Sequence, residues 1–160
     1  MAEAEGLLEL IKLYENDGQI DSWQARGPRK SEYVLWINRE PPPAAFIQSQ
    51  MTQAGYELQK GQFYGKAMYY FRLDYNVYRD SEPVLRIRAK RPTQEPLPGY
   101  QHGSKVKAEI QLRVSRSQPL ARQALKDFMS ALKSSEGLEA SIRTKIAQKL
   151  EKKGPIDKFV

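Results

Sequence analysis

The stretch QFYGKAMYYFRLDYNVYR, residues 62–79, alternates apolar or aromatic side chains with polar and basic ones along much of its length. Two further segments repeat this period of two, VLRIRAK at residues 84–90 and KVKAEIQLRV at residues 105–114. Successive side chains of a β-strand point to opposite faces of its sheet. The three segments therefore predict an antiparallel sheet with one face packed on a core and the other exposed to water.

The two faces of this predicted sheet differ in chemistry. The packed face receives the apolar register, which includes Leu73, Tyr75, Val77, Leu85, Ile87, Ala89, Ile110, Leu112 and Val114. The exposed face receives basic residues and tyrosines, namely Tyr64, Lys66, Tyr70, Arg72, Tyr78, Arg86, Arg88, Lys90, Lys105, Lys107 and Arg113. The loop of residues 92–104 between the second and third segments holds three prolines and two glycines, and could close over this face as a clamp.

The mixture of cations and tyrosines favours nucleic acid, either DNA or RNA, as the partner of the exposed face. Positive charge neutralises phosphates and releases their counterions, and aromatic rings stack on unpaired bases at roughly 1–3 kcal/mol per base. The alternative is a solvated surface on which Tyr, Arg and Lys pair across strands for stability and solubility.

The rest of the chain predicts helices around this sheet. Apolar spacing predicts helices over residues 2–16, 43–54, 117–133 and from 138 onward, with a break at Ser134 to Gly137. Residues 33–39 (YVLWINR) predict a strand with Trp36 in the core, and residues 22–31 predict a loop. In that loop, Trp23 is either an anchor for a partner or a lid over the core. The order α-β-α-β-β-β-α-α predicts an α+β fold, an antiparallel sheet packed on helices on one face.

Length and charge set the broad class. A chain of 160 residues with 40% hydrophobic and 28% charged residues is expected to form one globular domain over residues 1–160. The net charge of +7 is unevenly spread, because residues 1–25 hold six acidic side chains and one basic one. The acidic helix of residues 1–20 thus contrasts with a basic main body and a basic C-terminal segment, residues 134–160. Such asymmetry favours polyanionic partners for the main body.

Location and cofactors follow from what the sequence lacks. There is no cysteine, no apolar run near the ~20 residues that span a bilayer, and no basic start of a signal peptide. We therefore expect a cytoplasmic protein without membrane contact. No glycine-rich phosphate loop or metal-ligand motif occurs, so no cofactor is expected.

Two other functions compete with nucleic-acid binding. The first is an assembly module, in which the apolar stripe of Leu138, Ile142 and Ile146 joins copies of the chain into homo-oligomers. The second is a magnesium-dependent nuclease, with Asp74 and Glu109 on neighbouring strands holding the metal. Both acids have arginines or lysines around them in the sequence pattern, which favours salt bridges over metal binding.

Overall fold

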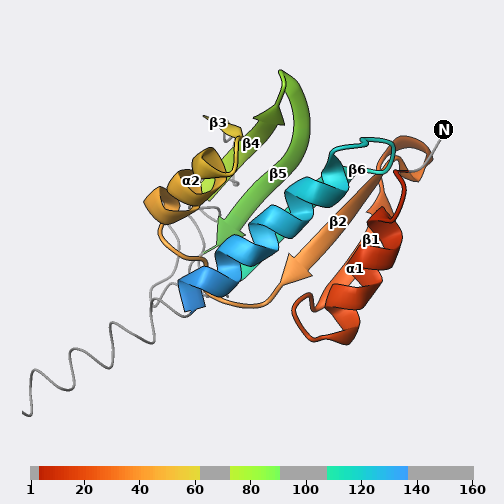
Figure 1. The fold of residues 1–160 in the computed structure, drawn as a ribbon. Helices are drawn as coiled ribbons and strands as arrows, with labels where there is room; N and C mark the ends of the chain where they lie inside the picture. The colour runs from red at the N-terminus through yellow and green to blue at the C-terminus, as the bar shows by residue number, and fades with distance from the viewer. Residues whose placement is uncertain (1–3, 62–72, 91–107, 137–160) are drawn as a thin grey trace, which may run out of the picture.

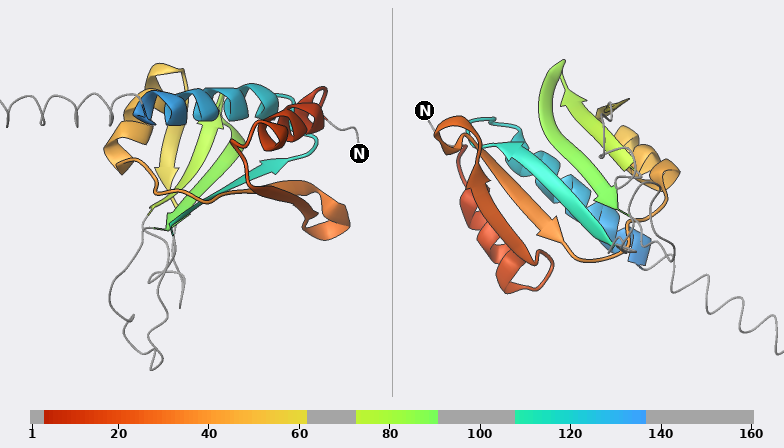
Figure 2. Two further views of the ribbon diagram at one scale, coloured as in Figure 1. Left: turned by 90° about the horizontal axis from the view of Figure 1, so that it is seen from below. Right: turned by 180° about the vertical axis from the view of Figure 1, so that it is seen from behind.

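A computed structural model describes residues 4–61, 73–90 and 108–136. In this part of the chain a six-stranded sheet carries helices on one face and leaves the other face without a helix (Figures 1 and 2). Every pair of neighbouring strands is antiparallel, in the order β1-β2-β6-β5-β4-β3. The predicted α+β class, with helices on one side of an antiparallel sheet, is confirmed.

The helices divide the covered face among them. Helix α1 lies over the β1–β2 side, α2 lies beside β3 and β4, and a helix of residues 121–136 runs between them (Figure 1). None of the described helices is long and apolar enough to span a membrane. The bounds of the elements are α1 Leu7–Asn16, β1 Ser22–Arg26, a short 3-10 turn η1 Pro28–Lys30, β2 Glu32–Ile37, α2 Ala44–Gln53, β3 Glu57–Lys60, β4 Leu73–Arg79, β5 Glu82–Lys90 and β6 Glu109–Ser115.

The core forms between the helices and the apolar register of the strands. All nine described strand residues assigned to the packed face by alternation are buried, from Leu73 on β4 to Val114 on β6. They meet Leu7, Leu10 and Ile11 of α1, Ile47 and Met51 of α2, and Ala121, Ala124, Leu125, Phe128 and Leu132 of the long helix. Each large apolar side chain buried in this way contributes about 1.5–3 kcal/mol, so the contact between sheet and helices holds the fold together.

The strands begin and end where local sequence dictates. Asp80 and Ser81, both at positive φ (52° and 64°), connect β4 to β5 in a two-residue hairpin turn. Turns of this kind match the right-handed twist of the flanking strands. Gly27, at φ 85°, lies between β1 and η1, and glycine takes such a backbone conformation without steric cost.

Three sequence predictions need correction. Residues 22–26 form strand β1 rather than a loop, because Trp23 and Ala25 pack against the core while the side chains between them stay exposed. Strand β3 was not predicted, since only Leu58 among its four residues is apolar. The long helix continues through Ser134 and Ser135 to residue 136 instead of breaking at Ser134. Ser135 is buried, so tertiary packing overrides the weak helix propensity of serine there.

Candidate functional site

The helix-free face of the sheet carries an arginine cluster, which we define as Arg86 and Arg88 of β5, Arg113 of β6 and Asp74 of β4. Strand register brings the four together: Arg86 lies opposite Arg113 on one side, and Arg88 lies opposite Asp74 on the other. Like charges directly opposite each other on a sheet are destabilising. The cluster therefore depends on the acids that share it.

Asp74 is the anionic centre of the cluster. Its side chain has no exposed surface and accepts two hydrogen bonds from Arg86, from Nε to Oδ1 at 3.2 Å and from Nη2 to Oδ2 at 2.9 Å. The Nε of Arg88 lies 3.4 Å from the same Oδ2. A planar guanidinium that bonds both oxygens of a carboxylate is among the strongest charge-assisted pairs in proteins. Asp74 is thus fully engaged by arginine.

Glycine makes room for this buried carboxylate. The edge residue Gly61 donates its backbone N–H to the carbonyl oxygen of Asp74 at 2.9 Å. A Cβ placed on Gly61 would lie 2.5 Å from Cγ of Asp74. Any side chain at position 61 would therefore displace the carboxylate or the strand.

The remaining charges pair more loosely. Arg113 lies 3.6 Å from Glu32 of β2, and Lys90 lies 3.5 Å from Glu109 of β6. The described carboxylates at the cluster are thus Asp74, which pairs with Arg86 and Arg88, and Glu32, which pairs with Arg113. Arg86 and Arg113 each keep about a third of their side-chain surface exposed (34% and 32%).

Electrostatics distinguish the two arginines of β5. The hydrogen bonds that Arg86 donates to Asp74 raise the pKa of Arg86. Burial lowers the pKa of Arg88, and the neighbouring charges of Arg86 and Arg113 lower it further against the opposing effect of Asp74. Arginine stays protonated at any physiological pH. Arg88 is therefore a charged group in partly dry surroundings, paired with Asp74 and close to two like charges.

The Nε donor of Arg113 and the Oε1 acceptor of Gln111 have no hydrogen-bond partner among the described residues, and both atoms are shielded from solvent. Gln111 lies opposite Arg88 in the sheet. Buried polar atoms usually find partners in protein or water, so these two atoms are exceptions to that rule among the described residues.

Trp36 lies on the helix-free face, on the side nearer to β1. The prediction that Trp36 belongs to the core is therefore wrong. Trp36 is only half-buried, lies outside the core cluster, and stands opposite Gln111 of β6. The guanidinium carbon of Arg26 lies 4.9 Å from the centroid of its ring. Trp23 lies on the other face, where it packs edge-on against Tyr33 at 5.7 Å and donates Nε1–H to Glu15 at 3.3 Å. Trp23 is thus a lid over the core.

The predicted site residues divide into two groups. Arg86, Arg88, Lys90 and Arg113 share the helix-free face as the alternation predicts. The others lie outside the described residues: Tyr64, Lys66, Tyr70, Arg72, Lys105 and Lys107, with the loop of residues 92–104 and the stripe of Leu138, Ile142 and Ile146. Sequence reasoning missed Arg26 and Trp36. The alternation in SWQAR, residues 22–26, was the available signal for Arg26.

The two acids considered as metal ligands are engaged by cations. Asp74 faces two arginines and Glu109 faces Lys90. Within residues 4–61, 73–90 and 108–136, no group of three or more His, Asp or Glu side chains is placed to hold a metal ion. The geometry around Asp74 favours a structural role for this carboxylate.

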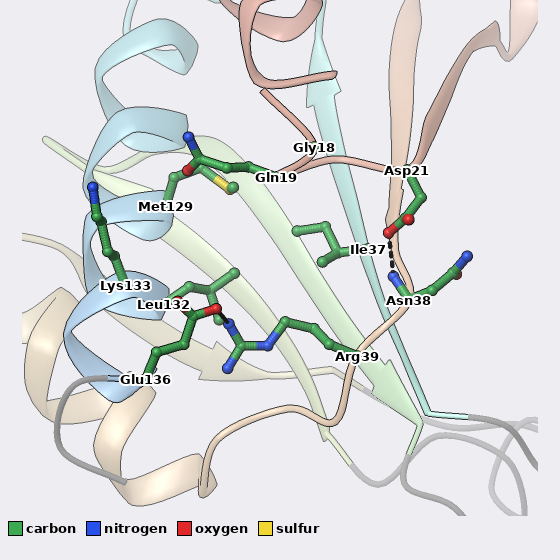
Figure 3. Close-up of a pocket in the computed structure, with 10 residues that line it drawn as sticks. All are labelled: Gly18, Gln19, Asp21, Ile37, Asn38, Arg39, Met129, Leu132, Lys133 and Glu136. Carbon is green, nitrogen blue, oxygen red and sulfur yellow. Dashed lines mark hydrogen bonds and ion pairs between the residues drawn. The ribbon is translucent and has the colours of Figure 1, made fainter. Parts of the chain in front are cut away.

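A second candidate is a hollow of about 370 Å³ at the end of β2 (Figure 3). Its apolar floor is formed by Ile37, Met129 and Leu132, which already belong to the core. An ion pair between Arg39 and Glu136 crosses one side, and Asp21 accepts a hydrogen bond from the backbone of Asn38 at 2.6 Å. Acids and cations balance around its rim, so its charge selects no class of ligand.

Comparison of the chain with protein-family models, curated proteins and solved structures gave no significant match.

Proposed function

We propose that this protein binds nucleic acid through the helix-free face of its sheet. The observation that carries the proposal is the arginine cluster, in which strand register brings three guanidinium groups together on the helix-free face, with Arg86 and Arg113 each about a third exposed. Guanidinium matches the geometry of phosphate and can bond it with two parallel hydrogen bonds. None of the described helices covers this face (Figure 2).

The chemistry of the cluster suits a phosphate at Arg113. Its pair with Glu32 is long and partly exposed, and such pairs are worth little in water. A phosphate oxygen could accept from the exposed part of the Arg113 guanidinium and lie in the positive field of the cluster. The Arg86–Asp74 pair would stay in place beneath, because it is shorter and better buried.

The test is a binding titration with labelled oligonucleotides. The protein is titrated into a labelled 20-nucleotide single strand and, separately, into a duplex of the same sequence. Binding is followed by fluorescence anisotropy at 50 and 200 mM salt. We expect sub-micromolar binding of at least one of them at 50 mM salt and a steep loss at 200 mM, because binding releases counterions. Absence of binding at 50 mM, or an affinity indifferent to salt, would contradict the proposal.

A matched pair of variants locates the site. Arg113→Gln removes one charge from the cluster, and Arg122→Gln removes the same charge from the helix of residues 121–136 on the covered face. We expect Arg113→Gln to weaken binding several-fold and Arg122→Gln to have little effect. Equal losses would show that only net charge matters. Arg86 is unsuitable for this test, because its removal would strip the buried Asp74 of its best partner.

A further inference from the structure

Trp36 lies in the same row of the sheet as part of the arginine cluster. Register places Trp36 opposite Gln111, Gln111 opposite Arg88, and Arg88 opposite Asp74, so the row crosses β2, β6, β5 and β4. Neighbouring strands are about 4.8 Å apart, so the backbone of Trp36 lies roughly 10 Å from that of Arg88 across the sheet. An aromatic ring and a phosphate-binding group are therefore within reach of one short segment of nucleic acid.

The ring of Trp36 already holds a flat, cationic partner. The guanidinium of Arg26 stacks 4.9 Å from its centroid, and Nε of Arg26 donates to Oε1 of Gln24 at 2.9 Å. Arg26 and Gln24 belong to the edge strand β1 and are exposed. Arginine planes and tryptophan faces are both surfaces on which bases stack. A base could take the place of Arg26 on the indole or add to the stack on its outer side.

We infer that this face selects unpaired nucleic acid and stacks one base at Trp36, an inference that rests on the proposed function. Bases inside a duplex are already stacked and paired, so they cannot present a free π-face to the indole. A single strand can place its phosphates on the arginine cluster and a base on Trp36 together. Phosphate contacts alone would not distinguish the two forms, so the preference depends on the ring.

Intrinsic fluorescence tests the inference, because the chain has only two tryptophans. In Trp23→Phe, Trp36 is the sole indole, and an unlabelled single strand should quench its emission. The matched variant Trp36→Phe retains Trp23, which lies on the covered face, and should show little quenching. Quenching in Trp36→Phe equal to that in Trp23→Phe would contradict stacking at Trp36.

Affinity gives the second readout. We expect Trp36→Leu to weaken single-strand binding about tenfold or more, as loss of a base stack predicts, and duplex binding to be weaker than single-strand binding in wild type. Trp36→Phe keeps an aromatic ring and should retain most of the affinity, which separates stacking from loss of structure. Duplex binding as tight as single-strand binding, without quenching, would overturn the inference and leave the proposed function standing. Failure of both oligonucleotides to bind would overturn both.

Discussion

Gly61 and Asp74 are coupled at the residue scale, since the carboxylate occupies the space that a side chain at position 61 would need. We expect Gly61→Ala to lower the free energy of unfolding by about 3 kcal/mol, because it forces the buried acid away from its arginines. In an Asp74→Ala background the same change should cost less than about 1 kcal/mol, as the obstacle is gone.

Urea unfolding of the four proteins of this double-mutant cycle measures the coupling. The Asp74→Ala protein is itself expected to be destabilised, because Arg88 and Arg86 lose their shared counterion. The cycle remains interpretable as long as that variant unfolds cooperatively. Equal costs of Gly61→Ala in both backgrounds would show that the two residues are independent.

Tyr56 is a buried residue whose ionisation can be used to measure a contribution to stability. Its hydroxyl donates to Asp127 at 2.6 Å and accepts from Nη1 of Arg79 at 3.2 Å. Burial, followed by the hydrogen bond to Asp127, raises the pKa of Tyr56 to about 12. The unfolded chain ionises near 10, so the folded state holds the neutral phenol more firmly. This contribution is complete below pH ~10 and is lost as the pH rises toward 12.

The comparison with Tyr56→Phe isolates that contribution. We expect the difference in free energy of unfolding between wild type and Tyr56→Phe to shrink between pH 9.5 and 11, measured by urea titration at each pH. Tyr14, whose pKa burial also raises, is common to both proteins and cancels. A difference that stays constant across this interval would contradict the account of Tyr56.

At the element scale, α1 is an integral part of the core rather than an appended acidic segment. Ile11 is fully buried, whereas Leu13, two residues later on the same helix, is 58% exposed. We expect Ile11→Ala to cost about 2–4 kcal/mol and Leu13→Ala less than about 0.5 kcal/mol, measured by urea unfolding. Similar costs would mean that α1 is not docked as described. Deleting residues 1–20 would remove Leu7, Leu10 and Ile11 and is expected to unfold the protein.

The elements that sequence predicted well are those with a strong periodic pattern. The alternation in β5 and β6 places Leu85, Ile87, Ala89, Ile110, Leu112 and Val114 in the core, as the structure has them. The helical spacing of α1 and α2 likewise places Leu7, Leu10, Ile11, Ile47 and Met51 there, whereas Leu13 of α1 is exposed. Strands β1 and β3 have too few apolar residues for such a pattern, and they exist because a neighbour offers them an unpaired edge. The residue type of Trp36 favours the core. Its position four residues after Glu32 on β2, however, puts both side chains on the same, helix-free face.

The sequence predicts which basic residues share the face of the candidate site, but not which of them lie opposite one another or pair with acids. Alternation alone places Arg86, Arg88 and Arg113 on one face. It does not show that Arg86 lies opposite Arg113, or that Asp74 lies beneath two guanidinium groups. Those contacts depend on register between strands that are far apart in sequence, which no local pattern specifies. The exposed face is accordingly less cationic than a count of its basic residues indicates.

At the scale of the whole molecule, the two faces of the sheet differ in role: one packs the core and the other carries the proposed binding residues. The described helices cover one face of the sheet (Figure 2). That face supplies the core, and the helix-free face carries the arginine cluster and Trp36. The two faces are separated by the thickness of a single sheet, so a bound ligand should affect one set of side chains directly and the other hardly at all.

The most direct measurement maps a single-stranded oligonucleotide by ¹H–¹⁵N correlation spectra of the labelled protein. We expect the largest shifts at the side-chain Nε–H signals of Arg86, Arg88 and Arg113 and at the indole N–H of Trp36. The indole N–H of Trp23 and the amides of residues 121–136 should move little. Shifts concentrated on that helix and on α1, with the arginine cluster unchanged, would contradict the account.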